Sequence, residues 1–413
     1  MDYTKKTPLM PMLIISSMYM ILGFSIGINA FFVPFVQTAF DVSTATSYLI
    51  MTATFSAYVV FGIPSGIIIK RTGYKGGITT SFLILALSFF LVGYAAQIAS
   101  FSLFLLALFI SGVGQTLLTG AVNSYVTILG PHESAAKRIC IMGIADKLAF
   151  AGASFILAAY INLTAVSLTQ VIAPFYIIAG LLVLIGIASY FSPLKELKAV
   201  GEDVGDVVAS HSDQKTSIFG YPHLFLGILA IFFDIGVEII ALGTINDYAV
   251  VLKLPSPENY VWYASFGMVA GYILGVNFIP HFLSQSAALI CSCLIGLATS
   301  IGIVLVQPAI SIYLVAVLGL ANSLLWPAIF PLALKDLGEF TKMGSSLLVM
   351  GIIGGAIIPL VFGFLADKWT YQNAYLICLP SYLYILYYAL YGSKIRISKK
   401  RAIRDYASGY VSG

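Results

Sequence analysis

Four ionisable side chains lie within long apolar stretches of the sequence, where a charge is costly. Asp146 and Lys147 are neighbours, and Asp234 and Glu238 are four residues apart. In a helix, that spacing puts Asp234 and Glu238 on one face, within about 6 Å of each other. Two carboxylates this close in an apolar medium repel each other, and a proton on one of them relieves the repulsion. The pattern therefore predicts a proton-binding group at this pair.

The neighbouring Asp146 and Lys147 extend this prediction. Adjacent residues of a helix point about 100° apart, but a long lysine side chain can bend toward a carboxylate. We interpret Lys147 as a charge partner of the acidic residues, and a static ion pair is the structural alternative to proton coupling. The candidates for proton coupling are Glu238, Asp146 and Asp234.

Uncharged polar residues recur in the same apolar stretches. Gln115, Thr119 and Asn123 follow one another every four residues, which predicts a polar stripe along one helix. Amide, carboxylate and aromatic groups together suit a ligand rich in hydroxyl groups, such as a sugar, although each amide alone also suits an interhelical hydrogen bond. The 28 Phe and 25 Tyr are interpreted mostly as lipid-facing or packing residues. The predicted substrate-binding residues are Asn29, Gln115, Thr119, Asn123, Asp146, Lys147, Glu238, Asn246, Asn322 and Trp326.

The chain that carries these residues has the composition of a membrane protein. Of its 413 residues, 60% are hydrophobic and 9% are charged, whereas soluble domains average about 25% charged residues. A bilayer core needs about 20 apolar residues per helix. This length predicts an all-helical membrane protein with twelve spans, at 11–36, 46–69, 77–97, 101–128, 140–163, 171–192, 221–251, 260–280, 286–306, 310–334, 344–365 and 373–392.

The predicted spans fall into two sets of six. The long polar connection 193–220 separates them, and Met142-Gly143-Ile144 recurs as Met350-Gly351-Ile352, at an offset of 208 residues. Parallel repeats with a binding site between them are typical of major facilitator proteins. The predicted units are an N-terminal six-helix bundle at 1–192, a cytoplasmic linker at 193–220, a C-terminal six-helix bundle at 221–393 and a basic cytoplasmic tail at 394–413.

The basic residues give the chain a direction in the membrane. With both termini in the cytoplasm, 18 of the 21 Lys and Arg fall in cytoplasmic segments, as the positive-inside rule expects. Their dispersal between apolar segments also argues against nucleic-acid binding. Glycines four residues apart, at 62 and 66 and at 267, 271 and 275, predict close helix packing.

Catalytic and metal-binding patterns are missing from the sequence. It has no glycine-rich phosphate loop ending in Lys-Ser or Lys-Thr, and no nucleophile, His and Asp arranged on one span. The four Cys lack the spacing of metal ligands. We therefore expect neither an enzyme nor a bound metal or cofactor.

Short motifs throughout the chain resemble those of a known family. They lie at 123–131, 133–138, 141–144, 221–224, 236–238, 326–327, 335–338, 341–350, 354–359, 363–368 and 372–375. These residues resemble the fucose–galactose–glucose:proton symporter family of the major facilitator superfamily. The resemblance implies twelve helices in two pseudo-symmetric bundles, a sugar site between them, H⁺ as the coupling ion, and a monomer in the bacterial inner membrane.

The departures from the family pattern concern its acidic residues. Ala30 stands where the fucose branch of the family carries Asp, and Thr119 stands where that branch carries Glu. Asp146 matches a sugar-contacting Asn of that branch, and Glu238 matches a Glu of related glucose and galactose permeases. Because the repeat offset places Glu238 opposite Ala30, we hypothesise that the acid has moved to the other half.

We therefore predict a proton-coupled importer of a monosaccharide that works by alternating access. Three alternatives stay open. The first is a transporter that imports or exports a non-sugar solute such as a siderophore, because a charged solute suits Asp146 and Lys147. The second is an uncoupled facilitator. The third is a non-transporting sensor, for which 193–220 and the basic tail are short.

Overall fold

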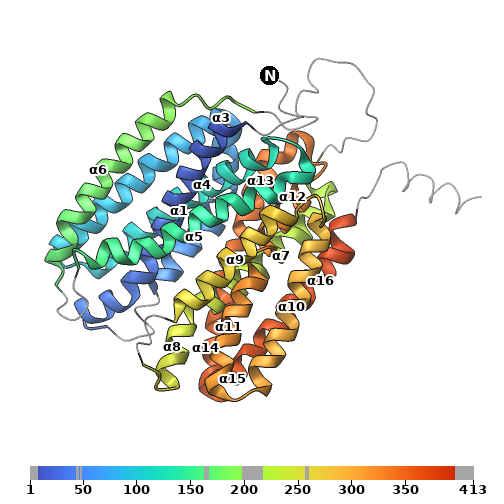
Figure 1. Ribbon diagram of the computed structural model, residues 1–413. Coiled ribbons are helices and arrows are strands. Elements are labelled where there is room, and N and C mark those ends of the chain that lie inside the picture. The colour runs from blue at the N-terminus through green and yellow to red at the C-terminus, as the bar shows by residue number, and fades with distance from the viewer. Residues whose placement is uncertain are drawn as a thin grey trace, which may run out of the picture.

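All regular structure in the described part of the chain is helical (Figure 1). The computed structural model describes residues 8–42, 46, 49–161, 167–197, 217–255 and 260–395. Ten helical stretches there are long and apolar enough to cross a membrane. One of them, Leu49–Gln97, covers two predicted spans, and the helix Ala135–Ala158 accounts for the twelfth. The predicted all-helical membrane fold is confirmed.

The N-terminal bundle, blue to green in Figure 1, lies beside the C-terminal bundle, yellow-green to red. In the first bundle, α3 packs against α4 and α6, and α1 packs against α4 and α5. Its elements are α1 (Leu9–Ala39), α3 (Leu49–Gln97), α4 (Phe101–Ile128), η1 (His132–Ser134), α5 (Ala135–Ala158) and α6 (Thr169–Phe191).

In the C-terminal bundle, α9 packs against α11, α10 against α11 and α16, and α7 against α14. Its elements are η2 (Ile218–Gly220), α7 (Pro222–Gly243), α8 (Ile245–Val251), α9 (Val261–Phe278), α10 (Gln285–Leu305), α11 (Pro308–Asn322), α12 (Leu325–Leu334), η4 (Gly338–Phe340), α13 (Thr341–Met350), η5 (Gly351–Ile353), α14 (Gly354–Lys368), α15 (Tyr371–Ala374), η6 (Tyr375–Ile377), α16 (Cys378–Leu390) and η7 (Gly392–Lys394).

Several predicted spans are interrupted in the structure. The break in α3 at Gly73, with φ 75° and ψ 176°, is not one of these, because it lies between the predicted spans 46–69 and 77–97; its backbone conformation favours glycine. The predicted span 310–334 divides into α11 and α12, 344–365 into α13, η5 and α14, and 221–251 into α7 and α8. Most of the predicted linker and tail, at 198–216 and 396–413, lies outside the described residues.

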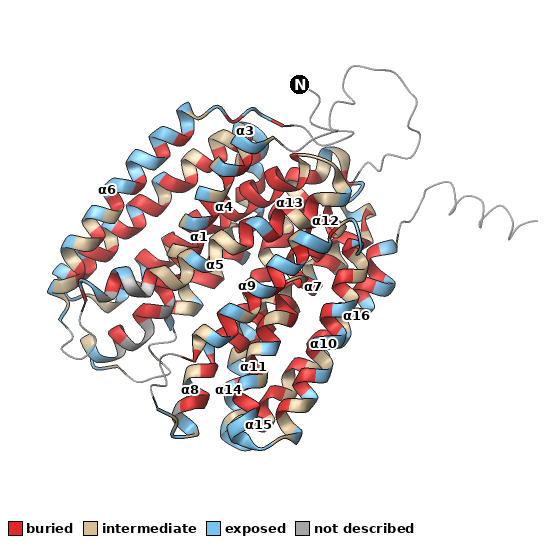
Figure 2. Cartoon of the chain, in the orientation of Figure 1, coloured by how far each residue is buried: buried red, intermediate tan, exposed pale blue. Residues whose placement is uncertain are grey.

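The outer surface of the helices is apolar, as lipid contact requires. Figure 2 shows exposed residues along the outward faces of helices such as α6, and buried residues toward the interior. Leu184 is 63% exposed and Phe90 50% exposed. Exposed side chains of this size would form an aggregation-prone surface in water, but they match the hydrocarbon of a bilayer.

Contacts between the bundles run through α3, α4 and α5 on one side and α9, α12 and α13 on the other. We call the end of the helices that carries Lys70, Arg71, Lys75, Lys335 and Lys342 the basic end. The predicted close packing of Gly62 and Gly66 occurs here, because both face α13 across the bundle interface. Gly267 and Gly271 instead face α11 within the C-terminal bundle.

Polar contacts also join the bundles at the basic end. Lys342 Nζ lies 3.4 Å from the Glu196 carboxylate and 5.1 Å from the centre of the Tyr74 ring. Both oxygens of that carboxylate accept from the backbone N–H of Tyr74. Nearby, Gln285 Nε2 donates to the backbone oxygen of His132 at 2.7 Å. Burial, reinforced by the nearby Lys335, lowers the pKa of His132.

Two glycines of α14 test how tightly this fold is packed. A Cβ at Gly354 would lie 1.8 Å from the backbone oxygen of Phe232, whereas a Cβ at Gly363 would meet nothing within 4 Å. Gly354→Ala is expected to destabilise the protein by about 1–3 kcal/mol through overpacking. Gly363→Ala, the matched control, should raise stability or leave it unchanged. Thermal unfolding in detergent measures both, and equal melting temperatures would contradict this packing.

Candidate functional site

Lys147 joins the two bundles through an ion pair. It lies in α5, and its Nζ donates to Glu238 Oε1 of α7 at 2.7 Å. The same nitrogen lies 3.1 Å from Asp146 Oδ2. The side chains of Lys147, Glu238 and Asp146 are 12%, 9% and 15% exposed. The lysine thus bends toward both acidic neighbours, and the ion pair foreseen as the structural alternative is present.

A close approach of α9 completes the surroundings of Lys147. A Cβ on Gly143 of α5 would lie 2.7 Å from Cζ of Tyr272, so only glycine leaves room for that ring. Tyr272 interacts electrostatically with Lys147, Glu238 and Asp146. The aromatic ring and the absence of a side chain at Gly143 therefore hold α5 and α9 together beside the ion pair.

Asp234 adds a third carboxyl group to this region. It is 0% exposed and interacts electrostatically with Glu238 and Lys147. We call Asp146, Lys147, Asp234 and Glu238 the charged cluster. It contains three carboxyl groups and one ammonium group, so with every carboxyl ionised it would carry a net charge of −2. Buried charges without partners are strongly unfavourable, and binding of protons or of a cationic group would reduce this imbalance.

Asn123 connects three helices by hydrogen bonds. Its Oδ1 accepts from the Tyr19 hydroxyl of α1 at 2.6 Å and from Trp326 Nε1 of α12 at 2.9 Å. Its Nδ2 donates to the backbone oxygen of Thr119. Trp326 also stacks on Phe330, with ring centroids 5.2 Å apart. Asn123 and Trp326, which sequence analysis proposed separately, therefore meet across the bundle interface.

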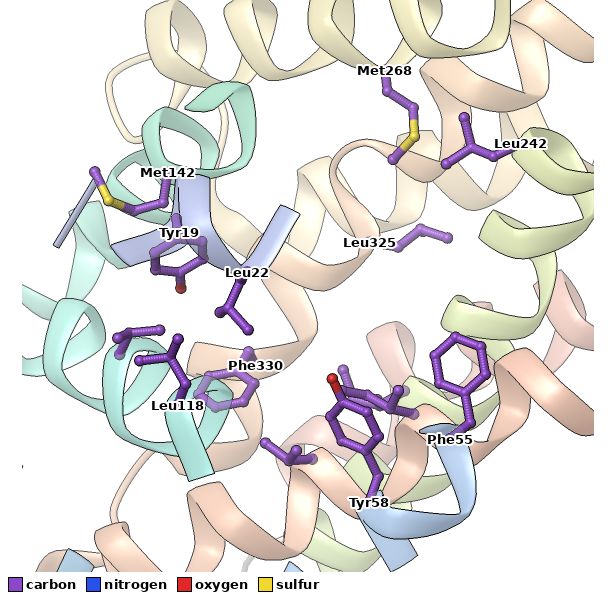
Figure 3. Packing of buried hydrophobic residues seen from close by; sticks show 14 of the residues in the cluster. Tyr19, Leu22, Phe55, Tyr58, Leu118, Met142, Leu242, Met268, Leu325 and Phe330 are labelled. Atoms are coloured by element: carbon purple, nitrogen blue, oxygen red, sulfur yellow. The ribbon is translucent and has the colours of Figure 1, made fainter. Parts of the chain in front are cut away.

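The rest of the predicted polar stripe on α4 is buried beside α3. Gln115 Oε1 accepts from the Tyr58 hydroxyl at 3.2 Å, and its Nε2 donates to Ser111 Oγ at 3.0 Å. Thr119 is 6% exposed. Figure 3 shows the hydroxyl groups of Tyr58 and Tyr19 pointing inward between the helices, toward the region of Leu22 and Phe330.

The three other predicted amides do not share these contacts. Asn29 is 1% exposed, and neither amide atom has a hydrogen-bond partner in the described part of the chain. Asn322 lies within the C-terminal bundle, where it donates to the backbone oxygen of Val237 and accepts from the Tyr382 hydroxyl. Asn246, in α8, accepts from the Val261 N–H at the start of α9. It follows the last residue of α7 and therefore lies at the end of the bundle opposite the basic end.

Tyrosines are the residues that sequence reasoning missed. Tyr19, Tyr58 and Tyr272 reach polar or charged groups rather than lipid, although the sequence interpretation assigned most tyrosines to packing. A buried tyrosine hydroxyl usually needs a hydrogen-bond partner. That requirement is the signal that could have identified them within the predicted spans.

The sequence and structure are similar to those of known transporters. A family model described as the Major Facilitator Superfamily matches residues 15–350. The chain is 32% identical over 383 residues to a glucose/galactose transporter of Brucella abortus, covering 90% of this chain and 91% of that protein. It is 27% identical over 401 residues to the L-fucose-proton symporter of Escherichia coli, covering 87% of each.

A solved structure repeats the arrangement of the two bundles. The structure of a Major Facilitator Superfamily transporter, FucP, in the outward conformation matches 94% of this chain and 100% of that one, with a TM-score of 0.79 and 25% identity. Ala30, one of the departures from the family pattern, lies in α1, but its side chain is outside the described residues. Its correspondence with Glu238 therefore stays a prediction.

Removal of the lysine tests the energetic role of the ion pair. Lys147→Met is expected to lower the melting temperature at neutral pH, because it leaves the carboxyl groups of Asp146 and Glu238 without their cation. Breaking a buried pair by removing one partner costs about 3–5 kcal/mol. Lys147→Met combined with Glu238→Gln should recover part of that loss. Additive losses in the double variant would show that the pair does not act as a unit.

Proposed function

The chain belongs to the Major Facilitator Superfamily, and we propose that it imports a monosaccharide together with a proton by alternating access. It is a multi-pass membrane transporter and not an enzyme. The observation that carries the proposal is the buried Lys147–Glu238 ion pair, which joins the two bundles at 2.7 Å. It lies at the interface that must rearrange when a transporter of this superfamily opens to the other side.

The chemistry around the ion pair suits a sugar. Carboxylates accept hydrogen bonds from hydroxyl groups, Lys147 donates, and the amides of Asn123 and Gln115 do both. Trp326 supplies an apolar face, and its contact with Asn123 already crosses the bundle interface. The names of the Brucella and Escherichia coli relatives, a glucose/galactose transporter and an L-fucose-proton symporter, support hexoses and deoxyhexoses as the solutes to test first.

The charged cluster supports coupling to protons. A net charge of −2 in a buried site is expensive, and protonation of one carboxyl group lowers that charge without any other ligand. A sugar, which is uncharged, cannot compensate the cluster by itself. Protonation of the cluster is therefore expected to accompany binding of the neutral solute, which is the basis of symport.

The contacts between the bundles support an outward-facing state. Lys342 with Glu196, and Gln285 with the backbone of His132, hold the bundles together at the basic end. We place this end and both termini in the cytoplasm, because positive residues favour that side. A monomer in the bacterial inner membrane, surrounded by lipid and without a metal or cofactor, completes the proposal.

Transport by purified protein in liposomes tests the proposed function. With a pH gradient that is acidic outside, we expect labelled glucose, galactose or fucose to accumulate, and added sugar to carry protons inward. Exchange of sugar without accumulation would identify an uncoupled facilitator. Absence of exchange for every sugar, with exchange of a charged solute such as a siderophore, would identify the alternative solute class and contradict the proposal.

The tryptophan at the interface provides a second test. Trp326→Phe keeps an aromatic face but removes the hydrogen bond to Asn123, which is worth about 0.5–1.5 kcal/mol. Because Trp326 and Asn123 then lose their fixed relative position across the bundle interface, affinity for the transported sugar should fall by up to about tenfold, measured from the sugar concentration that stabilises the protein thermally. Trp262→Phe on α9, where the ring lies against Phe266, is the matched control. Equal losses in the two variants would place Trp326 outside the binding site.

A further inference from the structure

Asp234 stands apart from the other acidic residues of the charged cluster. Its side chain is 0% exposed, and neither carboxyl oxygen has a hydrogen-bond partner in the described part of the chain. It lies on α7 one helical turn before Glu238. The ammonium group of Lys147 contacts Glu238 and Asp146. Of the three carboxyl groups in the cluster, Asp234 is therefore the one that forms no ion pair with Lys147.

The groups that face Asp234 cannot stabilise its charge well. Glu238 on its own helix repels a negative charge, and Lys147 attracts it from a distance while paired elsewhere. Cys293 of α10 and Tyr382 of α16 are the other ionisable groups near it in the described part of the C-terminal bundle. The Tyr382 hydroxyl donates to Asn322 Oδ1 and is therefore committed to another acceptor. An ionised carboxylate in such surroundings is costly, whereas a neutral carboxylic acid is not.

These contacts divide the roles of the two acids on α7, and the division rests on the function proposed above. We propose that Asp234 binds the transported proton, while Glu238 serves as the partner of Lys147 and as a contact for the sugar. On the side of entry, one O–H bond of a hydronium ion breaks, an O–H bond forms with a carboxylate oxygen of Asp234, and a water molecule is left. On the side of release, that O–H bond of Asp234 breaks and a water molecule takes the proton as hydronium.

The occupant that fits Asp234 is a proton rather than a metal ion. A hard cation needs a shell of several oxygen ligands, and in the described ranges no group of three or more His, Cys, Asp and Glu is placed to hold a metal. The neighbours of Asp234 on α10 and α16 are a thiol and a phenol that already donates to Asn322. A proton needs only the carboxyl group itself.

Protonation of Asp234 would act on the contact between the bundles. With Asp234 ionised, two carboxylates of α7 attract Lys147 of α5. With Asp234 protonated, the attraction from α7 comes from Glu238 alone and the net charge of the cluster falls from −2 to −1. Coulomb attraction in a buried site is strong. The proton therefore weakens the total attraction of α7 for Lys147 and lowers the cost of separating α7 from α5.

Asp234→Asn in liposomes tests this division. The near-isosteric amide cannot bind the proton, so accumulation driven by the pH gradient should fall to the level seen without a gradient, and sugar-driven proton entry should vanish, while exchange of labelled sugar persists. Glu238→Gln should weaken exchange itself. Asp367→Asn on α14, an exposed carboxyl in the same bundle, is the matched control and should accumulate sugar like the wild type.

The outcomes separate this inference from the proposed function. If Asp234→Asn couples sugar to protons as well as the wild type does, the role of Asp234 is overturned, while the proposed function still stands. A wild type that exchanges sugar without moving protons would overturn the proposed coupling, and the inference with it. Accumulation driven by a sodium gradient at equal pH would contradict the proton as occupant. If Asp234→Asn does not fold, Asp234→Glu should keep coupling with a displaced pH dependence, and an unchanged pH dependence would overturn the inference.

Discussion

The structure depends on how the chain buries one ammonium group among three carboxyl groups inside a membrane protein. Lys147 contacts Glu238 at 2.7 Å and Asp146 at 3.1 Å, and Asp234 is buried nearby without a hydrogen-bond partner among the described residues. This arrangement places the least compensated charge, Asp234, one helical turn from the Lys147–Glu238 ion pair that joins the two helix bundles. Any change in its protonation therefore acts on the interface that alternating access has to rearrange.

The sequence predicted those features of the fold that depend on the length of each apolar run, namely the number of spans and their approximate bounds. The helix Phe101–Ile128 has the same bounds as its predicted span, because nothing interrupts its apolar run. Breaks inside spans were not foreseen. Residues 323–324 separate α11 from α12, and Thr244 separates α7 from α8. Hydropathy measures how apolar a window is, and a local change of backbone conformation leaves it almost unaltered.

The candidate site was predictable only in part. Charges within apolar spans pointed to the charged cluster, since each requires compensation in lipid, but the sequence left open which carboxylates Lys147 would contact. The partners of Asn123 come from residues more than 100 positions away, Tyr19 and Trp326, and no short-range pattern records such a meeting. Asn246 lay in a predicted span and instead bonds to the start of α9, because that span ends early, at Gly243.

In such a transporter, the net charge of the charged cluster links the binding of a proton to the binding of the solute. The measurement that addresses this link most directly is the number of protons taken up when purified protein binds its sugar. Calorimetric titrations in two buffers with different heats of ionisation give that number. At a pH above the one at which the sugar-free cluster loses its proton, we expect net proton uptake on sugar binding, seen as a binding heat that changes with the buffer. A binding heat that is the same in both buffers would contradict the account.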